Sequence, residues 1–375
     1  MGRSLKLFSV RGIDVRLHFT FPLIFLWAGL QFGLIGGSTT AARVGVIVIA
    51  LLCVLVTLHE LGHSFAALYY GVPVKQIVLS PIGGLAQLER MPEKPVQEFV
   101  IAVAGPAVNV AVALLLAPFI PLFGLGAADF VAALSLNAGL TVTAVFVYVF
   151  FYNIILALFN LIPAFPLDGG RIFRSLLAMK LDYVRATNIA SIVGRGFAVL
   201  LGIYALFNGG IFMIFIAVFI FMAAGQEAVA VRYREALRGY TVADVYSPTA
   251  YTLNPYNNLQ QAVNLMMMSG QTSFPVVQNE ALEGFVTQQD LGQAMQVRGA
   301  HTWTNMIMRR DIRPLSPGTL LVDAQERLFA EQLESLPVVE NGRYLGLIGN
   351  WQIQQFFRLL SSNASVRPTV IQQSA

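Results

Sequence analysis

The sequence predicts a polytopic α-helical membrane protein with about six transmembrane helices, followed by a soluble α/β domain. Composition is the first observation: 56% of the residues are hydrophobic, 12% are charged, and the mean hydropathy is +0.66. These values lie outside the range of soluble domains. The second observation is that the composition changes at Thr241, after which the sequence repeats itself with a shift of 62 residues. The formal net charge of +4 does not indicate a nucleic-acid partner.

Six apolar stretches are each long enough to cross a hydrocarbon core of about 30 Å. Residues 1–16 precede them as a basic N-terminus that we place in the cytosol. We interpret the first stretch as an uncleaved span and not as a signal peptide, because no convincing small-residue cleavage site closes it. The predicted spans are 17–36, 44–71, 99–123, 136–162, 189–207 and 211–231, which together form a transmembrane domain over residues 17–231.

The loops between these stretches alternate in charge. Lysine and arginine gather in the N-terminus and in residues 75–94, 171–185 and 232–238, whereas the intervening loops contain almost none. Because cytosolic loops carry the excess of basic residues, both termini are predicted to lie in the cytosol. The expected location is therefore the cell (cytoplasmic) membrane, with a multi-pass topology in the lipid bilayer.

The second span contains three ionisable residues, His59, Glu60 and His63. Residues four apart lie on one face of a helix, so both imidazoles can bind one metal ion while Glu60 flanks them. The same residues on a soluble helix could be an ordinary solvated face, and here they could form an interhelical hydrogen-bond cluster. An ionisable group near a bilayer centre costs roughly 2.5 kcal/mol or more, however, and usually has a function. The spacing is that of the zinc-protease pattern H-E-x-x-H, and it therefore predicts a metal site.

Residues 72–90 are predicted to form a β-hairpin, because they are rich in β-branched residues and contain a Pro81-x-Gly83-Gly84 turn. A peptide bond in an intact helix is shielded by its own hydrogen bonds. An open strand edge beside a protease centre could receive an unwound substrate by β-addition. The alternative is an interfacial loop without substrate contact.

The third span begins with a close-packing signal, Gly105-Pro106, followed by Asn109 at membrane depth. Asn109 could bond a neighbouring helix and do nothing more. Alternatively, it could hold the substrate backbone or the developing oxyanion.

The fourth span ends in NLIPAFPLDGG, residues 160–170, where two prolines stop the helix just before Asp168. A catalytic zinc needs three protein ligands and one open position, and two histidines supply only two, so Asp168 is the natural third. The alternative is that Asp168 caps the next helix. Asn160 could orient a ligand or the substrate, or it could cap the broken helix end.

These three motifs, HELGH, Gly-Pro-x-x-Asn and NLIPAFPLDGG, resemble those of the site-2 protease family of intramembrane zinc metalloproteases, in the order that the family has them. The loops are too short for the PDZ module that some members carry. This is typical of the compact branch of the family that carries a C-terminal pair of CBS domains.

The resemblance implies an activity and the residues that perform it. One Zn²⁺ per chain would be bound by His59, His63 and Asp168, with Glu60 as the general base. The substrates would be membrane-anchored proteins, hydrolysed within or near their transmembrane segments in regulated intramembrane proteolysis.

The repeat after Thr241 places Leu253 on Leu315 and Gly284 on Gly346. Each copy is predicted to be a strand-helix-strand-strand-helix unit, and the two resemble a tandem pair of CBS domains over residues 242–298 and 304–360. Such pairs commonly bind adenine nucleotides, and a homodimer formed through them is a further expectation. Residues 361–375 are polar and are predicted to be a disordered tail.

The first repeat keeps the family's ribose-binding pattern in GFVTQQD, with Thr287 and Asp290 supplying a hydroxyl and a carboxylate. The second repeat has Gly349 and Gln352 at the matching positions. We therefore expect at most one nucleotide site, or none if the pair is a structural or dimerising module.

The main alternative function is a CBS-regulated membrane transporter or channel, because intramembrane ionisable residues also mark ion pathways. A carrier does not need a glutamate beside two histidines together with an aspartate after a broken helix. Hydrolysis uses all four, so a protease with a cytosolic regulatory module is the preferred interpretation.

Overall fold

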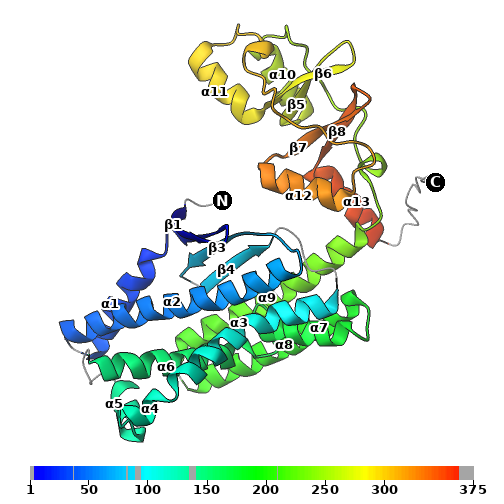
Figure 1. Ribbon diagram of the computed structural model, residues 1–375. Coiled ribbons are helices and arrows are strands. Elements are labelled where there is room, and N and C mark those ends of the chain that lie inside the picture. The colour runs from blue at the N-terminus through cyan, green and yellow to red at the C-terminus, as the bar shows by residue number, and fades with distance from the viewer. Residues whose placement is uncertain are drawn as a thin grey trace. The chain divides into compact units, whose positions relative to one another are not determined.

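Figure 1 shows the computed structural model, which describes residues 4–36, 38–81, 83–88, 94–134, 141–208 and 210–362. The chain divides into two compact units, Met1–Val229 and Ala230–Ala375. The first is mainly helical and the second combines a sheet with helices, as the sequence predicts.

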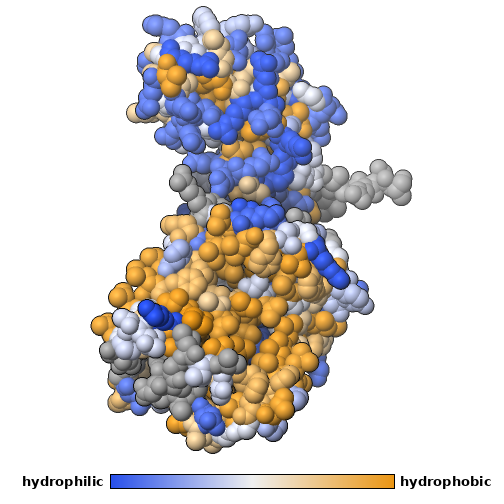
Figure 2. Space-filling model, turned by 60° about the vertical axis from the view of Figure 1, so that its left-hand side comes forward, coloured by the Kyte–Doolittle hydropathy of each residue, from blue (hydrophilic) through white to orange (hydrophobic). Residues whose placement is uncertain are grey.

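Five helices in the described residues are long and apolar enough to cross a membrane. Their outward side chains are apolar, and Figure 2 shows them as an orange surface that contrasts with the blue surface of the second unit. The helices are α2 (Thr39–Tyr69), α3 (Pro95–Leu116) with its short continuation α4 (Phe119–Leu122), α6 (Val142–Asn160), α8 (Tyr183–Phe207) and α9 (Ile211–Ala236).

The first predicted span is shorter than expected. Helix α1 (Pro22–Gly36) has 15 residues, which is about 22 Å at 1.5 Å per residue and less than the thickness of a hydrocarbon core. The apolar stretch starts within a strand, β2 (Ile13–His18). There Ile13 and Val15 are buried while Asp14 and Arg16 remain partly exposed. This alternation has the period of a strand, and the adjoining apolar run concealed it.

The N-terminal residues therefore belong to a sheet. Strand β1 (Ser4–Val10) pairs with β2, and β2 runs parallel to β3 (Val74–Ser80), which pairs with β4 (Gly83–Leu88). The predicted hairpin over 72–90 is confirmed as β3 and β4. Its buried residues Ile77 and Leu79 pack in one cluster with Ala67 of α2 and Ile101 of α3. In the order β1-β2-β3-β4, strand β4 lies at an edge.

Two further helices complete the first unit. Helix α5 (Ala127–Leu134) contacts α6, and α7 (Asp168–Ala178) packs against α3 and α8. The sequence predicted a break at residues 163–166 and considered a helix after Asp168 only as an alternative; in the structure Asp168 is the first residue of that helix, α7. The start of the predicted fourth span, at residues 136–140, lies outside the described residues.

The second unit has a four-stranded sheet in the order β5-β6-β8-β7, with two helices per repeat. The repeat of 62 residues is visible in the pairing: Ser273 faces Thr287 on β5 and β6, and Ser335 faces Gly349 on β7 and β8. The elements are α10 (Leu259–Ser269), β5 (Ser273–Gln278), β6 (Ala281–Thr287), α11 (Gln288–Arg298), α12 (Leu321–Glu331), β7 (Ser335–Glu340), β8 (Arg343–Gly349) and α13 (Asn350–Ser361). The predicted tail falls outside the described residues from 363 onward.

Candidate metal centre

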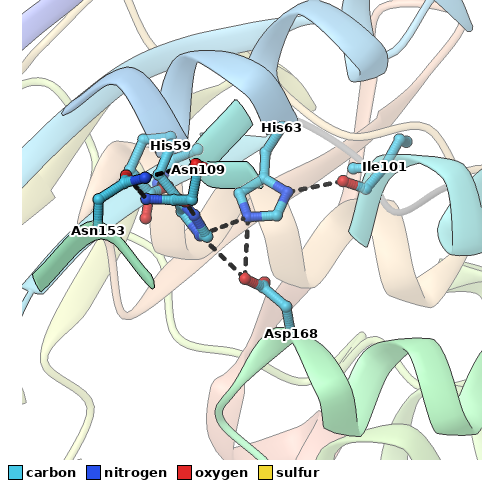
Figure 3. A network of polar contacts seen from close by, with 8 residues as sticks. His59, His63, Ile101, Asn109, Asn153 and Asp168 are labelled. Atoms are coloured by element: carbon cyan, nitrogen blue, oxygen red, sulfur yellow. Dashed lines mark hydrogen bonds and ion pairs between the residues drawn. The ribbon is translucent and has the colours of Figure 1, made fainter. Parts of the chain in front are cut away.

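Three metal-binding side chains converge in the helical unit. His59 and His63 lie one turn apart on α2, and Asp168 is the first residue of α7. Asp168 Oδ2 lies 3.0 Å from His59 Nε2 and 3.2 Å from His63 Nε2, and the two Nε2 atoms are 3.1 Å apart. Figure 3 shows the three side chains pointing at one another. All three are buried, and they form a group that could hold a metal ion.

The spacing of these atoms fits a tetrahedral zinc. Bonds of about 2.0–2.1 Å place two ligands of a tetrahedral ion roughly 3.3 Å apart. The three observed separations are close to that value. Three protein ligands leave the fourth position that a catalytic zinc requires.

The hydrogen bonds at Nδ1 of His59 and His63 also favour a cation between the two Nε2 atoms and Asp168. His59 Nδ1 is 2.5 Å from the Asn109 Oδ1, and His63 Nδ1 is 2.6 Å from the Ile101 carbonyl oxygen. Both partners accept, so each neutral ring carries its proton on Nδ1 and turns the Nε2 lone pair inward. Two lone pairs and a carboxylate oxygen in contact repel one another unless a cation lies between them.

Glycines allow α2 and α3 to approach closely enough to build this site. A Cβ atom on Gly105 of α3 would lie 2.2 Å from His63 Nε2, and one on Gly62 of α2 would lie 2.8 Å from the Ala104 carbonyl oxygen. No larger residue fits at Gly105 without moving a histidine. The Gly-Pro signal thus marks a close approach, as expected.

The position of Asp168 depends on how the start of α7 packs against the loop that follows α6. A Cβ on Gly169 would lie 2.3 Å from the carbonyl oxygens of Leu161 and Ile162, and one on Gly170 would lie 2.6 Å from the Phe165 nitrogen. The two glycines therefore let the start of α7 pack on the loop. Leu167 holds the N-cap position, so Asp168 is not the cap of this helix.

Asn109 lies behind His59 and is 1% exposed. Its Oδ1 contacts His59, its Nδ2 donates to Asn153 Oδ1 at 2.8 Å, and Asn153 Nδ2 donates to the Asn109 carbonyl oxygen. Both polar atoms of the Asn109 side chain are thus engaged within the protein. Asn153 was not among the predicted site residues, although it is an asparagine inside an apolar span, as Asn109 is.

Asn160 has a different position from the other site candidates. It is the last residue of α6, seven residues after Asn153 and therefore on the same face of the helix two turns away. None of the hydrogen bonds among the described residues joins Asn160 to the metal centre.

Glu60 is adjacent to His59 and contacts the edge strand. Its Oε2 accepts a hydrogen bond of 3.1 Å from the Ala86 N–H of β4. A Cβ on Gly84 would lie 2.6 Å from Glu60 Cγ, so glycine is needed for the strand to pass this side chain. The hairpin therefore lies directly against the residue that hydrolysis needs as a base.

Comparison with known proteins agrees with this geometry. Residues 47–201 match the model of peptidase family M50, and residues 242–296 and 305–355 match the CBS domain. The zinc metalloprotease MJ0392 of Methanocaldococcus jannaschii is 31% identical over 286 residues, which cover 76% of this chain and 78% of that protein. The chain belongs to peptidase family M50.

Two further similarities accompany this match. The stage IV sporulation protein FB of Bacillus subtilis is 28% identical over 206 residues, which cover 52% of this chain and 63% of that protein. The solved structure of a site-2 protease from M. jannaschii has 34% sequence identity, covers 60% of this chain and 95% of that chain, and has a TM-score of 0.45. The predicted family is confirmed for this M50 peptidase, as is its pair of CBS domains.

In the CBS pair of this M50 peptidase, the predicted ribose-binding residues contact each other and one unpredicted arginine. Thr287 is the N-cap of α11, and its Oγ1 donates to Asp290 Oδ2 at 2.7 Å. Arg309 donates to the same carboxylate through Nη2 at 2.7 Å and Nε at 2.9 Å. Burial alone would raise the pKa of Asp290, but the hydrogen bonds from Arg309 and Thr287 outweigh it and hold that pKa below its usual range.

Arg309 also lines a cleft within the second unit. The cleft has a volume of about 210 Å³ and lies between strand β6 of the first repeat and residues of the second, among them Arg310, Val339 and Gly342. Gly284 also lines the cleft, and a side chain would not fit at this position, because a Cβ there would lie 3.0 Å from the Arg309 carbonyl oxygen. Arg309 was not predicted, because the residue at the matching position of the first repeat, 62 residues earlier, is Ser247.

Proposed function

We propose that this chain is an intramembrane zinc metalloprotease that hydrolyses membrane-anchored proteins within or near their transmembrane segments. Membership of family M50 supports zinc-dependent proteolysis. The observation that carries the proposal is the convergence of two inward-facing imidazole nitrogens and one carboxylate oxygen between helices with apolar outer surfaces. A transporter would not need this ligand set.

The proposed roles follow from the contacts. His59, His63 and Asp168 hold the zinc, and Asn109, supported by Asn153, keeps the Nδ1 proton of His59 turned outward. A bound zinc ion supplies Lewis-acid polarisation and lowers the pKa of water toward about 7. Glu60 takes a proton from the attacking water and later returns it to the leaving amine.

We further propose that strand β4 receives the substrate. It is an edge strand, and the Ala86 N–H, which reaches Glu60, points away from its partner β3. A substrate unwound into a strand and paired with β4 would run past the base. Substrate or oxyanion contacts of Asn109 and Asn160 remain predictions. The buried and fully bonded side chain of Asn109 favours its role behind His59.

The CBS pair is the proposed regulatory module. We propose one adenine nucleotide bound by Thr287 and Asp290, with Arg309, which also lines the cleft, releasing Asp290 when the ribose binds. Homodimer formation through the pair is a second proposal. It is supported by apolar side chains exposed on the helices of the module, such as Met267, Phe329 and Trp351.

The membrane topology is proposed from charge. The excess of basic residues in alternate loops supports both termini in the cytosol of a multi-pass protein in the cytoplasmic membrane. This topology requires α1, although it is shorter than a hydrocarbon core, to cross the membrane as a sixth span. Protease protection of tags at the two ends, in sealed inverted vesicles, tests this. Resistance of either tag to added protease would contradict the topology.

The decisive experiment separates the base from the ligands. Glu60→Gln should abolish cleavage and keep zinc bound, because Glu60 carries a proton and does not bind the metal. His59→Ala, His63→Ala and Asp168→Ala should each lower both zinc content and activity. Metal analysis of the purified variants in detergent, alongside cleavage of a tagged membrane substrate, measures both quantities.

Two outcomes would contradict the assignment. A normal zinc content in Asp168→Ala would remove Asp168 from the ligand set. Substantial cleavage by Glu60→Gln would exclude Glu60 as the base. Gly196→Ala is the matched control, because a Cβ on this α8 glycine meets nothing within 4 Å.

A further inference from the structure

Arg174 is the largest fully buried side chain of the chain's described core, and the mechanism above does not use it. It lies on α7 and is 0% exposed. Its Nε donates to Glu98 Oε1 of α3 at 2.9 Å, its Nη2 contacts the same oxygen, and its Nη1 contacts Glu227 Oε1 of α9. One guanidinium thus joins three helices.

The surroundings of Arg174 fix it further. Its Cζ atom lies 5.0 Å from the ring centroid of Phe165, in the loop before Asp168, and 5.0 Å from that of Tyr183. The Glu98 side chain is 4% exposed, and that of Glu227 is 29% exposed. A guanidinium bonded to two carboxylates and in contact with two aromatic rings cannot move away without leaving a buried charge unpaired.

Two of the three helices that Arg174 joins, α7 and α3, contribute to the metal centre. Helix α7 begins with Asp168, six residues before Arg174. Helix α3 carries Ile101 and Asn109, whose oxygens fix the two histidine rings, and Glu98 stands one turn before Ile101. The Arg174–Glu98 pair therefore sets the distance between the carboxylate and the helix that orients both imidazoles.

We propose that Arg174 and Glu98 are positioning residues for the metal centre, and that Glu227 is the second, weaker arm of the same tie. This inference rests on the proposed zinc-binding role of Asp168. The pair touches neither metal nor substrate. It acts by holding α7 against α3, so that Asp168 meets the two Nε2 atoms at bonding distance.

The test measures zinc affinity apart from activity. Full-length Arg174→Gln and Glu98→Gln, purified in detergent, should each bind zinc up to roughly 10-fold more weakly in a chelator competition. Loss of a group bonded directly to a metal ligand costs about 10- to 100-fold, and this pair acts through the packing of two helices. The double variant should lose no more than Arg174→Gln alone, because Arg174→Gln already removes the contact with Glu98. Glu227→Gln should weaken binding by a smaller factor. Cobalt-substituted protein should show altered visible absorption bands in the variants that lose affinity.

The control is Ser191→Ala, which removes a buried hydrogen bond of 2.6 Å between α8 and α9 without touching α7. It should lower the melting temperature and leave zinc affinity unchanged.

Wild-type affinity in folded Arg174→Gln would overturn the proposal and leave Arg174 a structural role. If Arg174→Gln does not fold, Arg174→Lys decides: it keeps the charge but loses the two-edged geometry, and unchanged affinity would overturn the proposal. Unchanged affinity in Asp168→Ala would instead refute the ligand set.

Discussion

Two arginines of this M50 peptidase bind carboxylates in opposite settings. Arg174 in the helical unit is fully buried, with Glu98 4% exposed, whereas the Arg309 and Asp290 side chains in the CBS pair are 40% and 16% exposed. Breaking a buried pair costs about 3–5 kcal/mol, because an uncompensated charge stays behind, whereas exposed pairs contribute about 0–1 kcal/mol. The Arg174–Glu98 contact is therefore too costly to break in the folded protein, whereas a ligand could replace the Arg309–Asp290 contact at low cost.

This difference matches what each region is proposed to do. Proteolysis needs ligands fixed within fractions of an ångström, and the buried contacts of His59, His63 and Asp168 fulfil that requirement. A regulatory module must respond to concentration, so its binding groups need partners that a ligand can replace. The Asp290–Arg309 pair, which is partly exposed and whose Arg309 lines a cleft, has partners that a ligand can replace.

The largest expected effect is in the buried region. Gly105→Ala should remove most zinc binding and activity, because its Cβ would lie 2.2 Å from His63 Nε2 and the histidine or the helix must move. Zinc content and cleavage rate measure this, with Gly196→Ala as the control. Normal zinc content and activity in Gly105→Ala would show that the metal centre tolerates a shift of His63 or α3. The metal centre would then not be more rigid than the CBS pair.

An intermediate effect is expected in the CBS pair. Calorimetry of the full-length protein with an adenine nucleotide should show at most one site per chain, lost in Asp290→Ala and kept in Gln352→Ala. A hydroxyl and a carboxylate suit the ribose, and Gly349 and Gln352 cannot reproduce them. Two sites per chain, or a site insensitive to Asp290, would refute the assignment of the first repeat.

The smallest effect is expected at the hairpin, where the proposed pairing between substrate and β4 would form beside the metal centre. Replacing helix-weakening residues near a substrate's cut site by leucine should slow cleavage several-fold, because an intact helix cannot pair with β4. The cleavage rate of such a series, with leucine placed at the far end of the same helix as control, measures this. Equal rates throughout would remove the requirement for unwinding.

Local patterns predicted part of the metal centre. The spacing of His59 and His63 determines that both imidazoles share a face of α2, and the prolines before Asp168 indicate the break that frees it. Other parts could not be predicted this way. Asn153 stands 44 residues from Asn109, and Arg174 stands 76 residues from Glu98, so no local spacing connects either pair.

The first predicted span shows a second limit. In residues 13–18 the alternation of a strand adjoins an apolar helix, and hydropathy averaged over the stretch hides the boundary. Only the tertiary structure brings β2 beside β3, because two parallel strands that are neighbours in a sheet lie far apart in the sequence. The CBS pair was easier to predict, because its strand pairing lies within each repeat and is the same in both copies.

By itself the sequence determined the family motifs, the apolar helices and the register of the repeat, because these depend on residue type and on periods of two, 3.6 or 62 residues. Only the tertiary structure decided which residues support the ligands, where the base meets β4, and that Arg309 occupies the Asp290 carboxylate. Those contacts depend on distances between segments far apart in the chain. Packing sets such distances, and the glycines at 62, 84, 105 and 169 permit them.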